Sequence, residues 1–372
     1  MGDVSLIVLP GDEYRLQILV AHRGLWRMLP MADETSPSKM LTWRSDVDRL
    51  LHKVMEDIDE DPKADVTMGL RKAGAMVARK LLSEPLRLIL DEAAAAPAGP
   101  EPAKLFVYMH EQADWIPWEI AHDNNDFLCT RFLVVRLPIL PPKAPDLTDM
   151  TERPVHEIYH VMGKGVTIAS PIFDTWKGTF SALPGAATRE RAFPSAAGGW
   201  GNFPRLNDLD LLSNGGMPGI IHFTCHGAVD KDSGETYWTL DPSTGQPAEY
   251  RIEATNLDMI NDMLQLQRYR PLVFGNACAS AQVTPSDKGS LLAGFGTSFI
   301  QGGASNFIGT FAPVSAKVAI EFACTFYKFL LQDGLGVGQA LWKAKGTFAG
   351  LNDPSARFYC LYGPPGTRYK LE

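Results

Sequence analysis

Two short apolar segments in the second half of the chain constrain its fold more than any other feature. They are residues 219–224 (GIIHFT) and residues 271–276 (PLVFGN), and their nearly continuous apolar character is typical of strands buried on both faces of a sheet. Apolar residues at helical spacing separate or follow them, over residues 255–266, 316–331 and 337–348. Strands that alternate with helices predict an α/β fold, with a mostly parallel sheet and helices on both of its faces.

The first half of the chain predicts a smaller unit of the same class. Residues 5–9 and 104–109 (KLFVYM) are expected strands, and helical periodicity extends over residues 38–58 and 67–96. Pro85 should split or kink the second of these helices, because proline lacks the backbone N–H and clashes with the preceding turn.

A proline-rich linker at residues 138–145 is the clearest break in the pattern. We therefore expect an N-terminal α/β companion half, residues 1–145, and a second half, residues 146–372. Just before the linker, residues 127–137 should form a strand or a hairpin. After it, a short helix is expected from residue 188 onward.

Composition and charge exclude several classes of protein. The 372 residues include 35 Lys+Arg and 43 Asp+Glu, a formal net charge of −8, and 45% are hydrophobic. This apolar content excludes disorder along the whole length. The acidic surplus argues against nucleic acid as an obligate partner, because phosphate binding needs a basic patch. No apolar run approaches the ~18 residues of a membrane span. The first residues also lack a signal-peptide pattern, so we expect a cytoplasmic protein with no membrane partner.

The cysteines are scattered and never form a CxxC pair. They are Cys129, Cys225, Cys278, Cys324 and Cys360. An odd number without paired spacing, in a chain of this length, argues against a disulfide framework and favours a reducing compartment. Most can be small buried apolar residues, which leaves the question of whether one of them is reactive.

The best candidate for chemistry is a pair of residues that follow the two apolar strands. His226 comes just after the first strand and Cys278 just after the second. Ligand sites of open α/β sheets lie beyond the carboxyl ends of strands, so adjacent strands would bring the two side chains into one crevice. The imidazole could then take the thiol proton and later return it to a leaving amine. The backbone N–H groups of Gly227 and Cys278 are candidates for an oxyanion hole. The alternative is that His226 ends a strand and Cys278 is buried packing.

These residues resemble the CHAT proteases, of the caspase-like cysteine peptidase clan that also holds separase, legumain and the metacaspases. The likeness lies in residues 220–227 (IIHFTCHG) and 271–278 (PLVFGNAC), where the family places its catalytic histidine and its nucleophile. It continues in residues 116–119 (IPWE) and 302–314, and it covers roughly residues 100–372.

The resemblance implies a caspase-like fold and a function. Residues 146–372 would be the catalytic half, and residues 1–145 a regulatory or pseudo-caspase-like companion. Cys278 would be the nucleophile and His226 the general base of an endopeptidase that needs no cofactor and cleaves a protein substrate. Members of the family are commonly activated by another protein or ligand, often in bacterial defence or cell-death systems.

Two departures from the family pattern matter. Ala279 and Ser280 follow the nucleophile where most members carry an acidic residue and a threonine. Ser315 and Ala316 stand where an aspartate or two is usual. The first change affects the expected specificity pocket and the second a structural contact, but neither removes the nucleophile or the base.

Other interpretations remain beside the protease. His222 and Cys225 suggest a zinc site, but strand alternation places them on opposite faces, so no metal is expected. Asp230 is the candidate for substrate binding, since an acidic group there would select a basic residue; the alternative is a solvated turn. A catalytically silent interaction scaffold and a thiol transferase using the same two residues are the competing functions.

Overall fold

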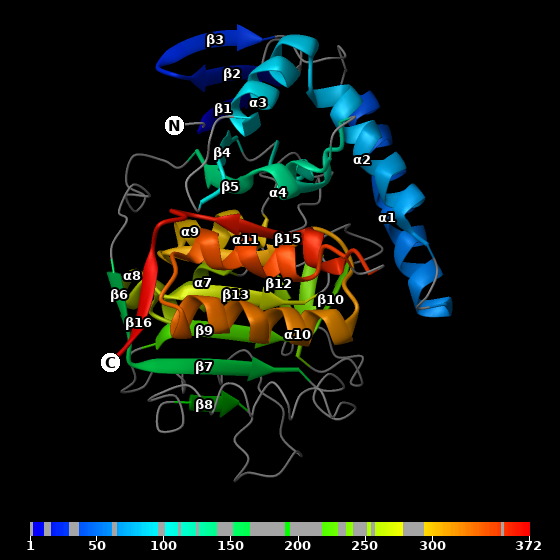
Figure 1. Ribbon diagram of the computed structural model, residues 1–372. Helices are drawn as coiled ribbons and strands as arrows, with labels where there is room; N and C mark the ends of the chain where they lie inside the picture. Colours follow the sequence, from blue (N-terminus) through cyan, green and yellow to red (C-terminus); the bar gives the residue numbers. More distant parts are fainter. Residues whose placement is uncertain are drawn as a thin grey trace.

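An eleven-stranded sheet joins both halves of the chain in the computed structural model (Figure 1). In spatial order its strands are β3 (Leu25–Leu29), β2 (Leu16–His22), β1 (Val4–Pro10), β4 (Lys104–Met109), β5 (Leu133–Pro138), β15 (Tyr359–Tyr362), β14 (Asn306–Thr310), β13 (Leu272–Asn276), β9 (Pro218–Thr224), β7 (Glu157–Met162) and β8 (Glu190–Phe193). The structure describes residues 3–10, 16–29, 37–61, 65–95, 101–110, 113–123, 126–139, 152–163, 190–193, 218–229, 236–240, 251–253, 257–277, 294–350 and 353–372.

The predicted, mostly parallel sheet is confirmed, and three of its strand pairings are antiparallel. The pairings of β1 with β2, β2 with β3, and β14 with β15 are antiparallel, and the others in this sheet are parallel. Two small sheets lie beside it. They consist of β10 (His226–Val229), β11 (Thr236–Thr239) and β12 (Arg251–Glu253), and of β16 (Arg368–Leu371) and β6 (Glu152–Val155).

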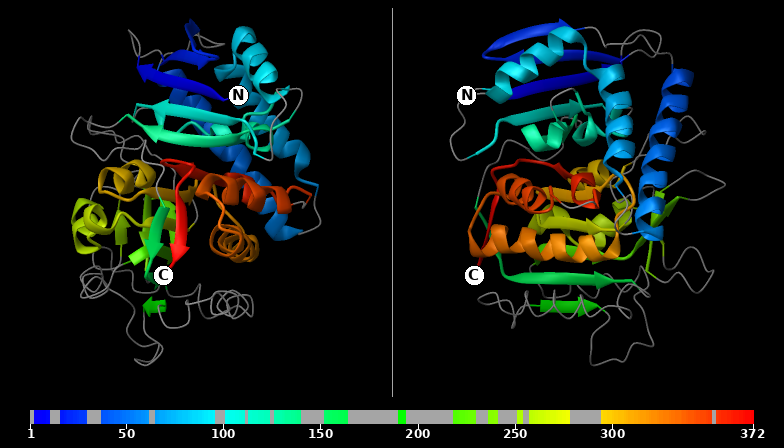
Figure 2. Two further views of the ribbon diagram at one scale, coloured as in Figure 1. Left: turned by 60° about the vertical axis from the view of Figure 1, so that its left-hand side comes forward. Right: turned by 45° about the vertical axis from the view of Figure 1, so that its right-hand side comes forward.

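Helices cover both faces of the sheet (Figure 2). They are α1 (Pro37–Glu60), α2 (Thr67–Leu81), α3 (Glu84–Ala95), η3 (Trp118–Ile120), α4 (Leu128–Arg131), α7 (Leu257–Met263), α8 (Leu266–Tyr269), α9 (Phe295–Gln301), α10 (Ala316–Tyr327), η8 (Lys328–Gln332), α11 (Val337–Thr347) and η9 (Ser355–Phe358). α10 and α11 pack on one face, while α1, α2, α3, α7 and α9 contribute to the core on the other. None of the helices in the described ranges is both long and apolar enough to cross a lipid bilayer.

The two halves meet where β5 pairs with β15. Tyr362 lies opposite Arg136 in this parallel pairing, so backbone hydrogen bonds connect the N-terminal strands to the C-terminal ones. The expected division into residues 1–145 and 146–372 stays a prediction, because most of the proline-rich linker lies outside the described residues.

Two local expectations were wrong. Residues 127–137 begin with a helical turn, α4, and only then enter β5, because Leu128 and Cys129 are buried on a helical turn rather than by strand pairing. Residues 190–193 form β8 beside β7, where a helix was expected. The interruption at Pro85 is confirmed: α2 ends at Leu81, and the proline lies in the first turn of α3, where its missing N–H costs no hydrogen bond.

The departure from the family pattern at Ser315 has a structural explanation. Ser315 is the N-cap of α10, and its Oγ accepts a hydrogen bond from the N–H of Val318. The same Oγ lies 2.5 Å from Oδ2 of Asp353. Serine suits this position because it is a good N-cap residue and its hydroxyl can also donate to the Asp353 carboxylate.

Candidate active site

The parallel pairing of β9 with β13 determines where the two candidate catalytic residues lie in the fold. The register pairs Thr224 with Asn276, the last residues of the two strands, so both strands end at the same edge of the sheet. His226 and Cys278 each lie two positions beyond these paired residues. Neighbouring strands are about 4.8 Å apart, so the chain leaves the sheet toward both positions from adjacent points. Cys278 itself lies outside the described residues.

His226 is part of a strand and not of a loop. It is the first residue of β10, which turns out of the large sheet after Cys225 and pairs antiparallel with β11, where Thr239 lies opposite His226. His226 is exposed to solvent, and the partial burial of its ring lowers the pKa of the imidazole below its usual value. The free base therefore predominates at neutral pH, which is the form that a general base requires.

An aromatic cluster holds the histidine strand against the helix that follows the cysteine segment. Trp238, on β11 opposite Gly227, is fully buried and stacks on Phe295 of α9 with ring centroids 4.4 Å apart and an interplanar angle of 4°. Trp238 also contacts Phe223 of β9, at 5.1 Å between centroids. Since α9 begins just after residues 278–293, the elements on either side of the candidate site share one packed core.

Hydrogen bonds fix the end of β13 immediately before Cys278. The side chain of Asn276 donates to the carbonyl oxygen of Ala319 on α10 (3.2 Å) and accepts from the hydroxyl of Tyr359 on β15 (2.7 Å). The hydroxyl of Thr310 on β14 donates to the carbonyl oxygen of Ala277 (2.9 Å). The backbone that leads to Cys278 is thus held from three elements. Sequence reasoning missed these residues, although a polar Asn276 at the end of an apolar strand was a usable signal.

The other sequence-predicted site residues are divided between described and undescribed parts of the chain. Gly227 follows His226 on β10 and is half-buried, and its role as an oxyanion donor stays a prediction. Asp230, proposed for substrate binding, lies outside the described residues, and its role stays a prediction.

A buried ion pair connects the PWE segment (residues 116–119) to β5 in the N-terminal half. Arg136 on β5 and Glu119 in η3 are both fully buried, with Nε–Oε1 and Nη2–Oε2 distances of 2.8 and 2.5 Å. Arg136 also donates to the carbonyl oxygens of Asp114 (2.7 Å) and Ile116 (2.9 Å). Although burial opposes it, the Glu119 carboxylate helps to hold the pKa of Arg136 well above its usual range.

The same cluster contacts α9 through Asp114. Its carboxylate accepts hydrogen bonds from the hydroxyls of Tyr362 on β15 and Thr297 on α9, each at 2.7 Å. Burial raises the pKa of Asp114, while Arg136 and the two hydroxyls oppose this shift. The N-terminal half therefore holds α9, the helix that follows the cysteine segment, through a buried polar contact. No sequence pattern indicated this contact, because Asp114 and Thr297 are 183 positions apart.

Two buried imidazoles lie deeper in the sheet. His160 on β7 and His222 on β9 are opposite each other in the register, with ring centroids 5.9 Å apart. His222 stacks on Phe274, and its Nδ1 lies 2.8 Å from the hydroxyl oxygen of Tyr327. Burial and the neighbouring His160 lower the pKa of His222 well below its usual value. Among the described residues, no group of three or more His, Cys, Asp and Glu side chains could hold a metal ion.

Acidification should destabilise the protein through His222. The unfolded imidazole takes up a proton below pH ~6.5, whereas the buried one resists protonation, so the unfolding free energy should fall by up to about 1.4 kcal/mol per pH unit below that value. Urea unfolding between pH 7.5 and 5 should show this slope in the wild type and a shallower one in His222→Gln. His52→Gln, at an exposed position, is the matched control. Equal slopes in all three proteins would contradict the assignment.

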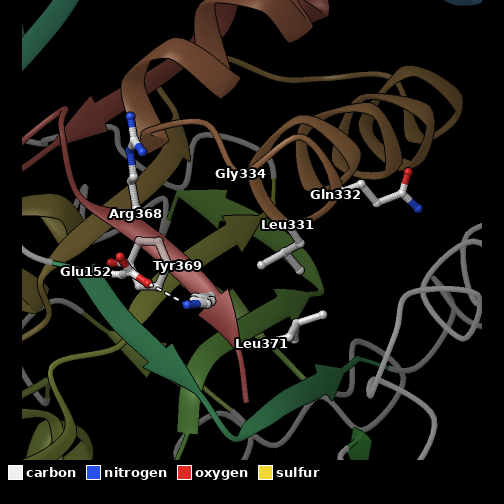
Figure 3. A pocket seen from close by; sticks show the side chains of 8 residues that line it. Glu152, Leu331, Gln332, Gly334, Arg368, Tyr369 and Leu371 are labelled. Carbon is white, nitrogen blue, oxygen red and sulfur yellow. Dashed lines mark ion pairs between the residues drawn. The ribbon is translucent and has the colours of Figure 1, made fainter.

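A pocket among the described residues lies away from the candidate site. It has a volume of about 630 Å³ and lies between β16, the start of β6 and the end of η8 (Figure 3). Lys370 and Glu152 form an ion pair at 3.3 Å across β16 and β6. Since Val155 of β6 packs against Gly219 at the beginning of β9, this pocket is at the amino ends of the strands, opposite the edge from which His226 emerges.

Comparison with solved structures places the fold in a known class. A chain in the crystal structure of the Saccharomyces cerevisiae separase–securin complex aligns with 99% of this chain at a TM-score of 0.57 and 12% identity. A second crystal structure of that complex aligns with a TM-score of 0.50 and 11% identity over the same share. In both, this chain spans 30% of the length of the matched chain. The Arg-specific cysteine proteinase gingipain R aligns with a TM-score of 0.48 and 10% identity, over 77% of this chain and 69% of its own.

The fold is therefore the caspase-like α/β fold of separase. The chain belongs to the CHAT-domain family, whose model matches residues 71–359. That match includes both strand ends, the PWE segment and the helices α9 and α10. No curated protein sequence shows significant similarity to the chain.

Proposed function

We propose that the protein is a cysteine endopeptidase that uses Cys278 as nucleophile and His226 as general base and acid. The observation that supports this most directly is the pairing of Thr224 with Asn276, which starts both residues from neighbouring strand ends. The lowered pKa of His226 and its exposure to solvent fit the role of a base that must meet a substrate. Membership in the CHAT family adds the expectation of peptide-bond chemistry.

The proposed reaction proceeds in two steps. His226 accepts the proton of the Cys278 thiol, and the thiolate attacks the scissile carbonyl carbon to form a C–S bond and a tetrahedral oxyanion. The oxyanion collapses as His226 gives the proton to the leaving amine, which breaks the C–N bond and leaves a thioester. His226 then takes a proton from water, whose oxygen attacks the thioester carbon to form a second tetrahedral oxyanion. As this collapses, the C–S bond breaks and His226 returns the proton to the Cys278 sulfur, which releases the acid product and restores the thiol.

Backbone donors would stabilise the oxyanion in both steps. We assign this role to the N–H groups of Gly227 and Cys278, since fixed backbone donors at a developing negative charge are the usual solution in acyl transfer. Asp230, close after His226 in the sequence, is our candidate for binding a basic residue of the substrate. By analogy with its family, the substrate is a partner protein, and a second protein or ligand in a bacterial defence or cell-death system activates the enzyme.

Selective alkylation tests the proposed nucleophile. At pH 6.5 an unassisted thiol is only about 1% thiolate, so iodoacetamide should label Cys278 about 10–100-fold faster in the wild type than in His226→Ala. Peptide mapping by mass spectrometry measures the rate at each cysteine. Cys129, Cys225 and Cys360 are buried and Cys324 is half-buried. Burial also raises the pKa of Cys129 and Cys360, so these thiols should react slowly in both proteins.

The same experiment separates the protease from the alternatives. Equal labelling of all five cysteines, or unchanged labelling of Cys278 in His226→Ala, would favour a silent interaction scaffold. Selective labelling together with peptide ligation, and without net hydrolysis, would favour a thiol transferase. Because His226 is exposed, its replacement should leave the unfolding midpoint unchanged, which controls for misfolding.

A further inference from the structure

The outer edge of β3, which no described strand covers, is a feature that the proposed protease site does not use. β3 is the outermost strand at the N-terminal end of the large sheet, and among the described strands it pairs only with β2 (Figures 1 and 2). Its other side presents backbone N–H and C=O groups, which form a template for another strand. Folded proteins usually blunt such an edge with charge, proline or a covering segment.

The turn before β3 determines which backbone groups point outward. Arg23 and Gly24 have φ values of 52° and 78°, as a two-residue type I′ hairpin turn requires. His22 and Leu25 flank this turn and are register partners, which makes them a hydrogen-bonded pair. The alternation that follows directs the backbone groups of Trp26 and Met28 away from β2, toward the outer edge.

The side chains of β3 are as unusual as its backbone. Leu25 is 59% exposed, and Trp26 and Met28 are each 57% exposed. Only Leu29 on this strand is buried. Large apolar side chains that are exposed on both faces of an edge strand mark an interaction surface. Exposed to water, they add no stability to the fold, whereas a bound partner would bury them.

The charged side chains on one face of the β2–β3 hairpin indicate what kind of partner could bind there. A pocket of about 230 Å³ lies between the hairpin and α3, and Leu25, Arg27 and Glu92 are among the residues that line it. Arg23 forms an ion pair with Glu92. Arg27, at the centre of β3, has no acidic partner within the described part of the chain. A carboxylate on a partner strand, directly opposite Arg27, would therefore form an ion pair with its guanidinium.

We propose that β3 binds an extended segment of a partner protein as an added strand. The segment carries an acidic residue opposite Arg27, flanked by apolar residues opposite Trp26 and Met28, so its core is apolar–acidic–apolar. Backbone hydrogen bonds to Trp26 and Met28 supply the register, and the flanking side chains supply selectivity. This site is independent of the proposed peptidase chemistry, which starts at the ends of β9 and β13.

A second copy of the chain fits the same edge poorly. The antiparallel pairing of β3 with its own copy that uses the whole strand would place Arg27 opposite Arg27, because this residue is central in the strand. Like charges directly opposite each other destabilise a strand pair. Charge complementarity therefore favours an acidic partner segment over self-association.

Selection of displayed peptides tests the proposal on the full-length protein. A phage library of random dodecapeptides should yield binders enriched in the apolar–acidic–apolar core. Their affinity, measured by fluorescence anisotropy on synthetic peptides, should fall about tenfold for Arg27→Glu, where attraction becomes repulsion, and much less for Arg27→Lys. Met28→Pro removes an outward N–H without removing a bond to β2, so it should weaken binding far more than Met28→Ala does.

Each opposing result overturns the proposal. Failure to enrich any common core would do so, as would selected peptides that bind Arg27→Glu and Met28→Pro as tightly as the wild type. Sedimentation velocity measures the oligomeric state as a third test. A wild-type dimer that Met28→Pro converts to a monomer would show that a second copy of the chain covers the edge of β3. Thermal unfolding of each variant verifies that the β2–β3 hairpin is retained in a folded protein.

Discussion

Cys278→Ala should abolish proteolysis, lowering kcat/KM by about 10⁴–10⁶-fold, because the nucleophile and its base act as one unit. For the same reason, His226→Ala should have an effect of similar size, and the double variant should lose little more than either single one. Comparison of neo-N-termini in cells that express wild type or Cys278→Ala, together with the products of neighbouring genes, identifies the substrate. A peptide that spans the mapped cleavage site then gives kcat/KM.

A matched thiol controls this measurement. Cys324 lies on α10, is half-buried and has no role in the proposed mechanism, so Cys324→Ala should retain cleavage. Neo-N-termini that persist in Cys278→Ala would exclude Cys278 as the nucleophile. Additive losses in the double variant would mean that His226 contributes by some route other than activation of the thiol.

Glu119→Ala should destabilise the fold by about 3–5 kcal/mol, because it leaves the charge of Arg136 buried without its partner. Both side chains are fully buried, so water cannot replace the lost carboxylate. The free energy of unfolding from urea titration measures the loss. Because Asp114 belongs to the same cluster and binds Thr297, we also expect weaker anchoring of α9 and slower alkylation of Cys278.

Two comparison variants separate charge from packing at this position. Glu119→Gln retains a hydrogen-bond acceptor for Arg136 and should lose less stability than Glu119→Ala. Combining Glu119→Ala with Arg136→Met removes the unpaired charge and should recover part of the loss, although the carbonyl oxygens of Asp114 and Ile116 then lose their donor. A Glu119→Ala protein as stable as wild type would show that the cluster is not required for the fold.

Many of the strands could be predicted because they correspond to local runs of apolar residues in the sequence. The apolar runs at residues 104–109, 219–224 and 271–276 correspond to β4, β9 and β13 to within a residue. The strands that were missed lack such a signal. β15 contains two tyrosines and a cysteine in a short segment, and β8 carries charged residues at two of its four positions.

The supporting residues of the candidate site could not be predicted in the same way. Trp238 has no sequence feature that distinguishes it from other aromatic residues, and only its stacking on Phe295 connects β11 to α9. Asp114 and Thr297 carry no motif of their own, and their hydrogen bond depends on how two distant segments pack. Contacts of this kind arise from the tertiary arrangement, and single-sequence periodicity contains no information about them.

The amino-acid sequence alone determined that two apolar segments are buried strands and that His226 and Cys278 each follow one of them. Periodicity and residue type are sufficient for this, because burial on both faces of a sheet demands continuous apolar character. Only the tertiary structure decided that β9 and β13 are direct neighbours, in parallel and with Thr224 opposite Asn276. Backbone hydrogen bonds between strands are nearly independent of the side chains, so uniformly apolar strands do not specify which of them pair. The order of the strands is determined by how the helices pack on both faces of the sheet.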